Sequence, residues 1–202
     1  MKQLKMIRPK GKVVPRSLPE GYSFAFFTEC REDIDAWCDV CRKADMLVTT
    51  DNDTVFNKVM RSVRDIELEK DLFFVVAPDG SKVATSALIH KKESNSGYLH
   101  MVAAVPEYRN LGLGHAMLSF AMSLAKERKL DYCVLTTDDY RLPAIKNYLV
   151  GGFHPVIYYD PDSDMRLRWL SVAQKLGFES LNFIEECFAF SLLFFLCLEI
   201  HE

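Results

Sequence analysis

Residues 105–117 read VPEYRNLGLGHAM, and this stretch decides how the chain around it folds. An apolar run ends at Val105, Arg109 and two glycines follow, and an amphipathic pattern begins at Leu113. Glycine adopts positive φ angles without steric cost and lets a backbone come close to a ligand. The stretch therefore predicts a strand that turns sharply into a helix.

The segments on either side of this turn predict an α/β fold. After the turn, apolar residues recur with a helical period up to about residue 129. Before it, the pattern predicts antiparallel strands joined by tight turns, at residues 72–78, 82–90 and 97–105. A strand at residues 131–137 should run parallel to residues 97–105, because a helix connects the two.

Further elements complete the predicted architecture. We expect strands at residues 22–27 and 153–159, and helices at residues 32–44, 54–68, 142–150 and 165–178. The order predicts a mixed, mostly antiparallel central sheet flanked by helices. We divide the chain into an N-terminal extension, a main domain and a C-terminal extension with a helical, apolar tail, at residues 1–20, 21–159 and 160–202.

Composition excludes several classes of protein. The chain has 202 residues, 49% of them hydrophobic and 26% charged, which is typical of a globular domain. A net charge of −3 provides no basic surface field, so we expect no nucleic-acid partner. The first residues lack the apolar core of a signal peptide, and we expect a cytoplasmic protein.

Two features of the sequence favour structural interpretations. Cys38 and Cys41 imitate a redox Trp-Cys-x-x-Cys motif, but they share one face of the predicted helix and lack further ligands, so we predict buried thiols and no metal site. A thiol redox protein remains a minor alternative. The uncharged run at residues 188–198 is shorter than the roughly 20 residues of a membrane span. We expect it to pack on the sheet or to form a homodimer contact, and not to enter a membrane.

The glycine turn has two interpretations on its own residues. The start of a helix presents unpaired N–H groups and a partial positive charge, and Arg109 adds a cation, so the turn could hold a phosphate. It could also be a plain bend. The dinucleotide fingerprint would need a small residue at Met117, and the P-loop motif is absent.

Two motifs resemble the GNAT family of N-acetyltransferases. The family's acetyl-CoA signature, Arg/Gln-x-x-Gly-x-Gly/Ala, is met by Arg109, Gly112 and Gly114. A second block, Ala-x-x-x-Tyr-x-x-x-Gly-Phe, is similar to residues 144–153 and includes Tyr148. The resemblance covers roughly residues 20–159 and implies the GNAT fold.

The resemblance also implies a co-substrate and its site. In GNAT enzymes the fourth strand splays from the fifth, and its end binds the acetyl and pantetheine arm of acetyl-CoA. The following turn holds the pyrophosphate on its backbone N–H groups. The residues implied for acetyl-CoA binding here are Val102, Ala103, Ala104, Val105, Arg109, Asn110, Leu111, Gly112, Leu113, Gly114, His115 and Ala116.

The catalytic groups are less completely matched. Tyr148 corresponds to the tyrosine that commonly protonates the leaving thiolate as general acid. Residues 95–105 lack the strand carboxylate that several relatives use as base, so His100 is the candidate base, with Glu107, Asp138 and a water relay left open. Arg141 stands where many relatives carry an Asn that contacts the cofactor arm.

The sequence thus predicts acetyl transfer from acetyl-CoA to a small-molecule or peptide primary amine in a ternary complex. The alternative is a non-catalytic acyl-CoA-binding or sensing domain with a partner-binding apolar tail. The resemblance implies that the acceptor is set by the loop between the first two helices and the loop around the last strands, here at about residues 45–55 and 158–170. Their acidic residues would favour a cationic amine if they faced the cleft, or would be solvated loop carboxylates.

Overall fold

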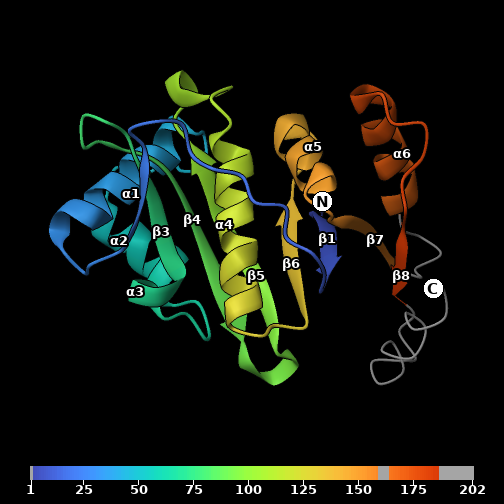
Figure 1. The fold of residues 1–202 in the computed structure, drawn as a ribbon, viewed down its shortest axis with the longest axis horizontal. Helices are drawn as coiled ribbons and strands as arrows, with labels where there is room; N and C mark the ends of the chain where they lie inside the picture. The colour runs from blue at the N-terminus through green and yellow to red at the C-terminus, as the bar shows by residue number, and fades with distance from the viewer. Residues whose placement is uncertain (1, 159–163, 187–202) are drawn as a thin grey trace. The chain divides into compact units, whose positions relative to one another are not determined.

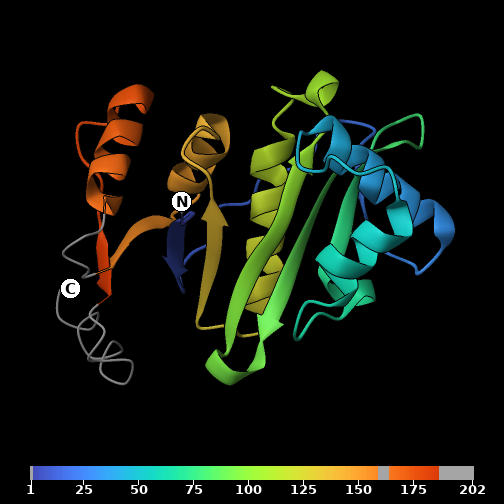
Figure 2. The ribbon, with the colours of Figure 1, turned by 180° about the vertical axis from the view of Figure 1, so that it is seen from behind.

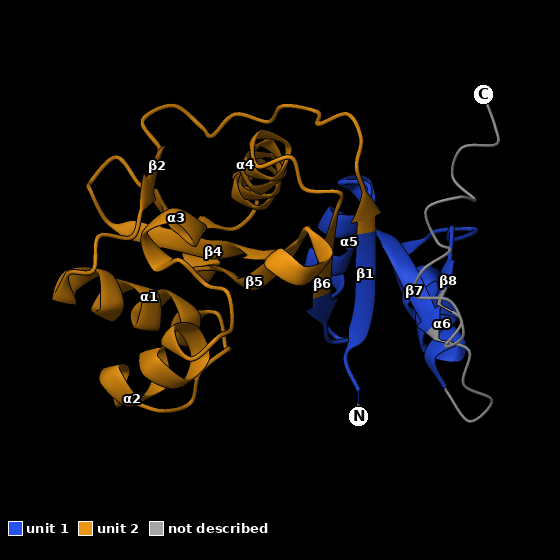
Figure 3. Cartoon of the chain, turned by 90° about the horizontal axis from the view of Figure 1, so that it is seen from below, with its two compact units in different colours: residues 1–7, 136–202 blue, residues 8–135 orange. Residues whose placement is uncertain are grey.

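The computed structural model describes residues 2–158 and 164–186 (Figure 1). Contacts divide the chain into two compact units: residues 1–7 with 136–202 form unit 1, and residues 8–135 form unit 2 (Figure 3). The apolar run at residues 188–198 lies outside the described residues. The predicted domain boundaries at residues 20 and 159 remain predictions.

Unit 2 is built on a mixed sheet with the strand order β2-β3-β4-β5-β6. Neighbouring strands are antiparallel from β2 to β5, and β6 runs parallel to β5. The mixed, mostly antiparallel sheet is therefore confirmed. The strands are β2 (Ser23–Phe26), β3 (Leu72–Val76), β4 (Lys82–Lys91), β5 (Ser96–Ala104) and β6 (Tyr132–Thr137), whose last two residues belong to unit 1.

Helices cover both faces of this sheet. Helix α4 (Leu113–Glu127) lies on one face, and α1 (Arg31–Lys43) and α2 (Asn52–Phe56) lie on the other (Figures 2 and 3). On the α1 face, Trp37 packs edge-on against Phe56 within a fully buried apolar cluster, with ring centroids 5.2 Å apart. On the α4 face, Phe120 stacks on Phe24 at 4.1 Å. The first ring contact joins α1 to α2, and the second joins α4 to strand β2.

The single helix predicted at residues 54–68 is wrong. Helix α2 passes into a π turn, η1 (Asn57–Arg61), and a separate short helix, α3 (Leu68–Asp71), leads into β3. Asp65 has a φ of 70°, a left-handed conformation that a right-handed helix cannot contain. The apolar spacing correctly indicated a helical start, but it does not reveal where the backbone register changes.

Unit 1 contains an N-terminal strand that the sequence did not predict. Strand β1 (Leu4–Pro9) pairs antiparallel with β7 (His154–Tyr158), which pairs parallel with β8 (Ile184–Glu186). Only Leu4 and Met6 of this strand are buried, and the positions beside them include Lys5 and Arg8. Ile7 directly follows Met6, so the apolar residues of this strand do not alternate regularly with the basic ones and the pattern is too weak to be recognised as a strand.

The helices of unit 1 agree with the sequence. They are α5 (Leu142–Val150) and α6 (Met165–Leu176). Arg168 of α6 binds Asp139 and donates to the Lys2 carbonyl at 2.9 Å, which ties the helix to the start of the chain. Two short 3₁₀ turns in unit 2, η2 (Lys92–Ser94) and η3 (Pro106–Tyr108), follow β4 and β5.

Candidate functional site

The glycine turn joins β5 to α4 through two left-handed residues. The 3₁₀ turn η3 ends at Tyr108 with Arg109 as its C-cap, and Asn110 has a φ of 62°. Gly112 caps helix α4 with a φ of 80° and a ψ of 1°. A Cβ atom built on Gly112 would meet nothing within 4 Å, so the turn is open at this point. The glycine serves the backbone conformation and leaves the space in front of the helix free.

Backbone donors remain unpaired along this turn. The Ala116 N–H donates to the Gly112 carbonyl at 3.1 Å and forms the first bond of the helix. Within residues 2–158 and 164–186, the N–H groups of Leu111, Gly112, Leu113 and His115 have no hydrogen-bond partner. The Arg109 side chain beside them is exposed. An anion would find several donors and a cation there, and the predicted N–H of Ala116 is already engaged in the helix.

Strand β5 loses its neighbour before it reaches the turn. It pairs with β6 only from Ser96 to Tyr98, so residues 99–104 have no ladder partner on that edge within the described chain. The Val105 N–H bonds the Val83 carbonyl at 2.9 Å, and the alternation of an antiparallel ladder directs the backbone groups of Ala104 to the opposite edge. The strand end implied to bind an acyl arm thus has backbone hydrogen-bonding groups without a ladder partner in the described chain.

A β-bulge interrupts the pairing of β5 with β4 directly after His100. His100 pairs with Ala87 and Ala103 with Thr85, which leaves two residues of β5 opposite one of β4. Within the bulge, Met101 has a φ of 52°, a conformation uncommon outside glycine, Asn and Asp. The bulge lies between the candidate base and the exposed strand end.

His100 faces the α1 side of the sheet and is half-buried. Its Nε2 atom lies 2.8 Å from the Val59 carbonyl oxygen, in the π turn η1. Burial lowers the pKa of the imidazole, against the opposing effect of this hydrogen bond. The neutral ring therefore predominates near pH 7.

Tyr148 lies in unit 1, near the end of α5, and its ring is buried. The Phe153 N–H bonds the Tyr148 carbonyl at 3.0 Å, the Gly152 N–H bonds the Leu149 carbonyl at 3.1 Å, and Gly152 has a φ of 85°. This is a Schellman cap, and the Tyr148 and Phe153 rings make its apolar contact, with centroids 6.0 Å apart. The Tyr-x-x-x-Gly-Phe block is thus, at the least, a helix stop.

The tyrosine also keeps its proton. Burial raises the pKa of Tyr148 to about 12, although the nearby Arg141 charge acts in the opposite direction. Arg141 itself donates to the Asp138 carboxylate at 3.3 Å, and Asp138 also accepts from Gln3 at 3.1 Å. Asp138 is therefore committed to polar partners within unit 1, while Glu107 lies exposed in η3 of unit 2.

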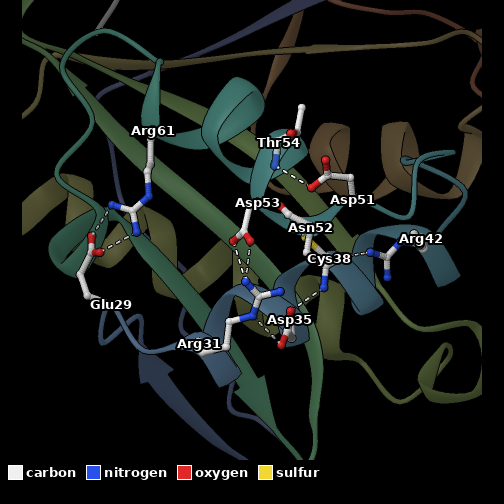
Figure 4. Close-up of polar contacts among 10 residues, drawn as sticks. All are labelled: Glu29, Arg31, Asp35, Cys38, Arg42, Asp51, Asn52, Asp53, Thr54 and Arg61. Atoms are coloured by element: carbon white, nitrogen blue, oxygen red, sulfur yellow. Dashed lines mark hydrogen bonds and ion pairs between the residues drawn. The ribbon is translucent and has the colours of Figure 1, made fainter.

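Two acidic residues of the loop between α1 and α2, Asp51 and Asp53, have partners within the described chain (Figure 4). Arg31 donates to both oxygens of Asp53, at 2.6 and 2.7 Å, and to Asp35 at 3.0 Å. Asp51 accepts the Thr54 N–H at 3.0 Å and so caps α2. Of the acidic residues that the sequence offered for binding a cationic amine, Asp51 and Asp53 both have structural partners.

Further contacts hold the same loop against α1. Asn52 donates to Asp35 and accepts from Arg42, which also donates to the Thr49 carbonyl at 2.9 Å. On the other side of Figure 4, Arg61 of η1 pairs with Glu29 at 2.7 Å. These contacts fix the start of α2 and the π turn relative to α1.

The cysteine pair is structural. Cys38 and Cys41 are fully buried in the α1 cluster, and burial raises the pKa of the Cys38 thiol to about 11. A thiol of such high pKa forms little nucleophilic thiolate at neutral pH. The described part of the chain also holds no group of three or more potential metal-ligating side chains, and none of its helices has the length and apolarity to cross a membrane.

The fold and the turn define a class of protein. A mixed α/β sheet carries a strand that loses its partner, bulges, and enters an open glycine turn at a helix N-terminus. The model of the acetyltransferase (GNAT) family matches residues 34–153, more than half of the chain. The chain belongs to the GNAT family.

Solved structures support the same fold. The chain is similar to a GCN5-related N-acetyltransferase from Sphaerobacter thermophilus (TM-score 0.58, 17% identity, 77% of this chain and 49% of that one). It is also similar to a GCN5-related N-acetyltransferase from Kribbella flavida (TM-score 0.52, 20% identity, 77% of this chain and 55% of that one). A third similar structure is the ribosomal-protein-S18-alanine N-acetyltransferase from Escherichia coli (TM-score 0.51, 16% identity, 64% of this chain and 75% of that one).

These likenesses concern the fold. The chain spans about half the length of the first two structures. No curated protein sequence matches it significantly.

Proposed function

We propose that the protein transfers an acetyl group from acetyl-CoA to a primary amine by direct attack in a ternary complex. Family membership supports an acyl-CoA-dependent acyltransferase. The observation that carries the proposal is the set of N–H groups of Leu111, Gly112, Leu113 and His115, which lack a partner in the described chain and lie beside the exposed Arg109. These groups would bind the pyrophosphate of the coenzyme.

The open edge of β5 supplies the second half of the proposed site. Backbone groups around Ala104 would bind the pantetheine arm in the manner of an added strand, and a β5 N–H would stabilise the oxyanion of the thioester carbonyl. Because backbone donors are fixed in the sheet, little reorganisation is needed as charge develops. The adjacent turn would then hold the other end of the same molecule.

The proposed reaction requires proton transfers at the attacking nitrogen and at the leaving sulfur. A base takes one proton from the ammonium form of the acceptor, which costs about 4 to 5 kcal/mol to deprotonate at pH 7 for an amine of ordinary lysine pKa. The free amine forms a C–N bond to the acetyl carbon, and the C–S bond breaks. The amide nitrogen releases its second proton to solvent, and the thiolate takes one from Tyr148, whose raised pKa keeps it protonated. The Tyr148 phenolate then regains a proton from solvent.

Calorimetric titration of the chain with acetyl-CoA tests the binding step. Saturable binding at micromolar to low millimolar concentration is expected. If acetyl-CoA at millimolar concentration gives no heat of binding, it is excluded as the co-substrate. A panel of monoamines, polyamines, aminoglycosides and peptide N-termini, followed by release of free CoA, then identifies the acceptor.

Tyr148→Phe distinguishes an enzyme from a non-catalytic acyl-CoA sensor. We expect kcat to fall by roughly 10- to 1,000-fold, because the leaving thiolate loses its proton donor, while the Kd of acetyl-CoA changes less than about twofold. Val150→Ala, an exposed position on the same helix, is the control. Unchanged turnover in Tyr148→Phe would assign the tyrosine to the helix cap alone.

A further inference from the structure

The π turn η1 frees a backbone carbonyl that an α-helix would have used. Just after η1 the Ser62 N–H bonds the Asn57 carbonyl at 2.9 Å, five residues back, and the Val63 N–H bonds the Met60 carbonyl at 3.0 Å. In an uninterrupted α-helix the Val63 N–H would bond Val59. The Val59 carbonyl instead accepts the hydrogen bond of His100 from β5.

This contact determines which nitrogen of His100 carries the proton. A carbonyl oxygen only accepts hydrogen bonds, so the Nε2 atom 2.8 Å from Val59 is the protonated nitrogen of the neutral ring. The other nitrogen, Nδ1, then holds the lone pair that can take a proton. A backbone carbonyl fixed by helix register orients an imidazole as a carboxylate does in other sites.

The π turn is held rigidly enough for this role. Met60 and Phe56 are fully buried beneath it. Arg61 pairs with Glu29 at 2.7 Å and lies over the Phe56 ring at 5.5 Å. The Val59 carbonyl is therefore anchored on both sides of its own residue, by apolar packing and by an ion pair.

His100 also occupies a distinctive position on β5. It lies two residues beyond the last pair with β6 and directly before the bulge at Met101. The open strand edge proposed for the acyl arm begins at this point. The charged and titratable groups that face the ring are Lys91 of β4 and Tyr98 of β5, while η1 contributes the Val59 carbonyl.

We propose that the π turn Asn57–Arg61 is a positioning device for catalysis, which fixes His100 with Nδ1 as the atom that accepts the proton of the acceptor amine. This proposal rests on the proposed acetyltransferase function. His100 is then the catalytic base, and Val59 acts through it. The proton moves from the ammonium nitrogen to Nδ1, directly or through one water, and returns to solvent after the amide has formed.

The variant His100→Gln distinguishes the hydrogen bond that His100 donates to Val59 from its proposed role as a base. The glutamine amide can still donate to Val59, but it has no nitrogen that titrates near neutral pH. We expect kcat/KM to fall by roughly 100- to 10,000-fold, with the Kd of acetyl-CoA within about twofold of the wild type. Because the base must be neutral to accept a proton, the activity of the wild type should fall as the pH falls through the His100 pKa. This decrease at low pH should be absent from the pH profile of the variant.

His90→Gln is the matched control. His90 lies on β4 with its Nε2 atom 3.1 Å from Asn95 Oδ1, and it has no place in the proposed site. Its variant should keep the wild-type rate and pH profile. A second measurement, two-dimensional ¹H–¹⁵N NMR of histidine-labelled protein above the His100 pKa, should show the Nε2–H tautomer for His100.

The outcomes separate this inference from the function beneath it. A wild-type chain that binds no acetyl-CoA overturns the proposed function and the base together. If the wild type acetylates amines and the His100→Gln variant keeps both its kcat/KM and the fall of activity at low pH, the role of His100 as base is overturned while the proposed function stands. An Nδ1–H tautomer overturns the positioning role of the π turn whatever the kinetics show.

Discussion

The glycine turn and the α1–α2 loop carry the same kinds of polar groups in opposite conditions. In the turn, Arg109 is exposed and several backbone donors lack partners in the described chain. In the loop, Arg31 bridges two carboxylates and Asp51 caps a helix (Figure 4). The glycine turn has hydrogen-bond donors without partners in the described chain, whereas the polar groups named in the α1–α2 loop are bonded to other parts of the protein.

The difference teaches how to separate a binding site from a polar surface. Charge alone does not distinguish the two, because both regions are rich in it. A ligand gains free energy where donors are preorganised and unpaired, since no internal bond has to break first. By this criterion the turn is the proposed anion site, and the paired carboxylates of the loop serve stability.

A negative charge in the turn should have the largest effect. Gly112→Asp is expected to weaken acetyl-CoA binding by more than about 100-fold, because a carboxylate would repel the pyrophosphate at close range. Calorimetry measures the loss. A Cβ atom at position 112 would have no neighbour within 4 Å, so no steric clash is expected. The substitution should lower the free energy of unfolding only by the cost of a left-handed backbone, about 1 kcal/mol.

Gly112→Asn is the control for that experiment. Asparagine has nearly the same shape as aspartate, tolerates the left-handed conformation equally well and carries no charge. We expect it to weaken binding less than about tenfold, by steric effects alone. Equal losses in both variants would attribute the effect to the shape of the turn and contradict an anion site.

Loss of the turn's cation should have an intermediate effect. Arg109→Ala is expected to raise the Kd of acetyl-CoA by about 10- to 100-fold, as removal of a charge-assisted hydrogen bond to phosphate costs about 1.5 to 3 kcal/mol. The loss should shrink at high ionic strength, because an exposed cation is screened. Arg109→Lys should restore part of the affinity. A Kd that is unchanged in Arg109→Ala would place the pyrophosphate elsewhere.

The paired loop should show the smallest effect. Asp53→Asn keeps the side-chain shape but removes the charge that Arg31 binds, and exposed ion pairs contribute little to stability. We expect Tm to fall by no more than about 2 °C, with kcat/KM for every acceptor in the panel within about twofold. A tenfold rise in KM for polyamines alone would show that this carboxylate binds the acceptor.

Local patterns made much of the fold predictable. The turn from residue 105 to residue 117, the hairpins before it and the parallel strand after it follow from hydrophobic period, glycine placement and connection rules, which act over a few residues. The end of α5 is similar, because Gly152 and Phe153 complete a cap within one turn of helix. The missing strand, β1, depends on a partner far along the chain, β7, and its own pattern is weak.

The candidate site divides in the same way. The sequence by itself determined the open glycine turn, since the residues that form it are consecutive and glycine alone permits the geometry at Gly112 without strain. Only the tertiary structure decided the state of the other groups. Asp51 and Asp53 already have hydrogen-bond partners, and the imidazole of His100 contacts the Val59 carbonyl of the π turn. Hydrogen-bond partners distant in sequence are chosen by packing, and a side chain's identity does not reveal whether its capacity is already used.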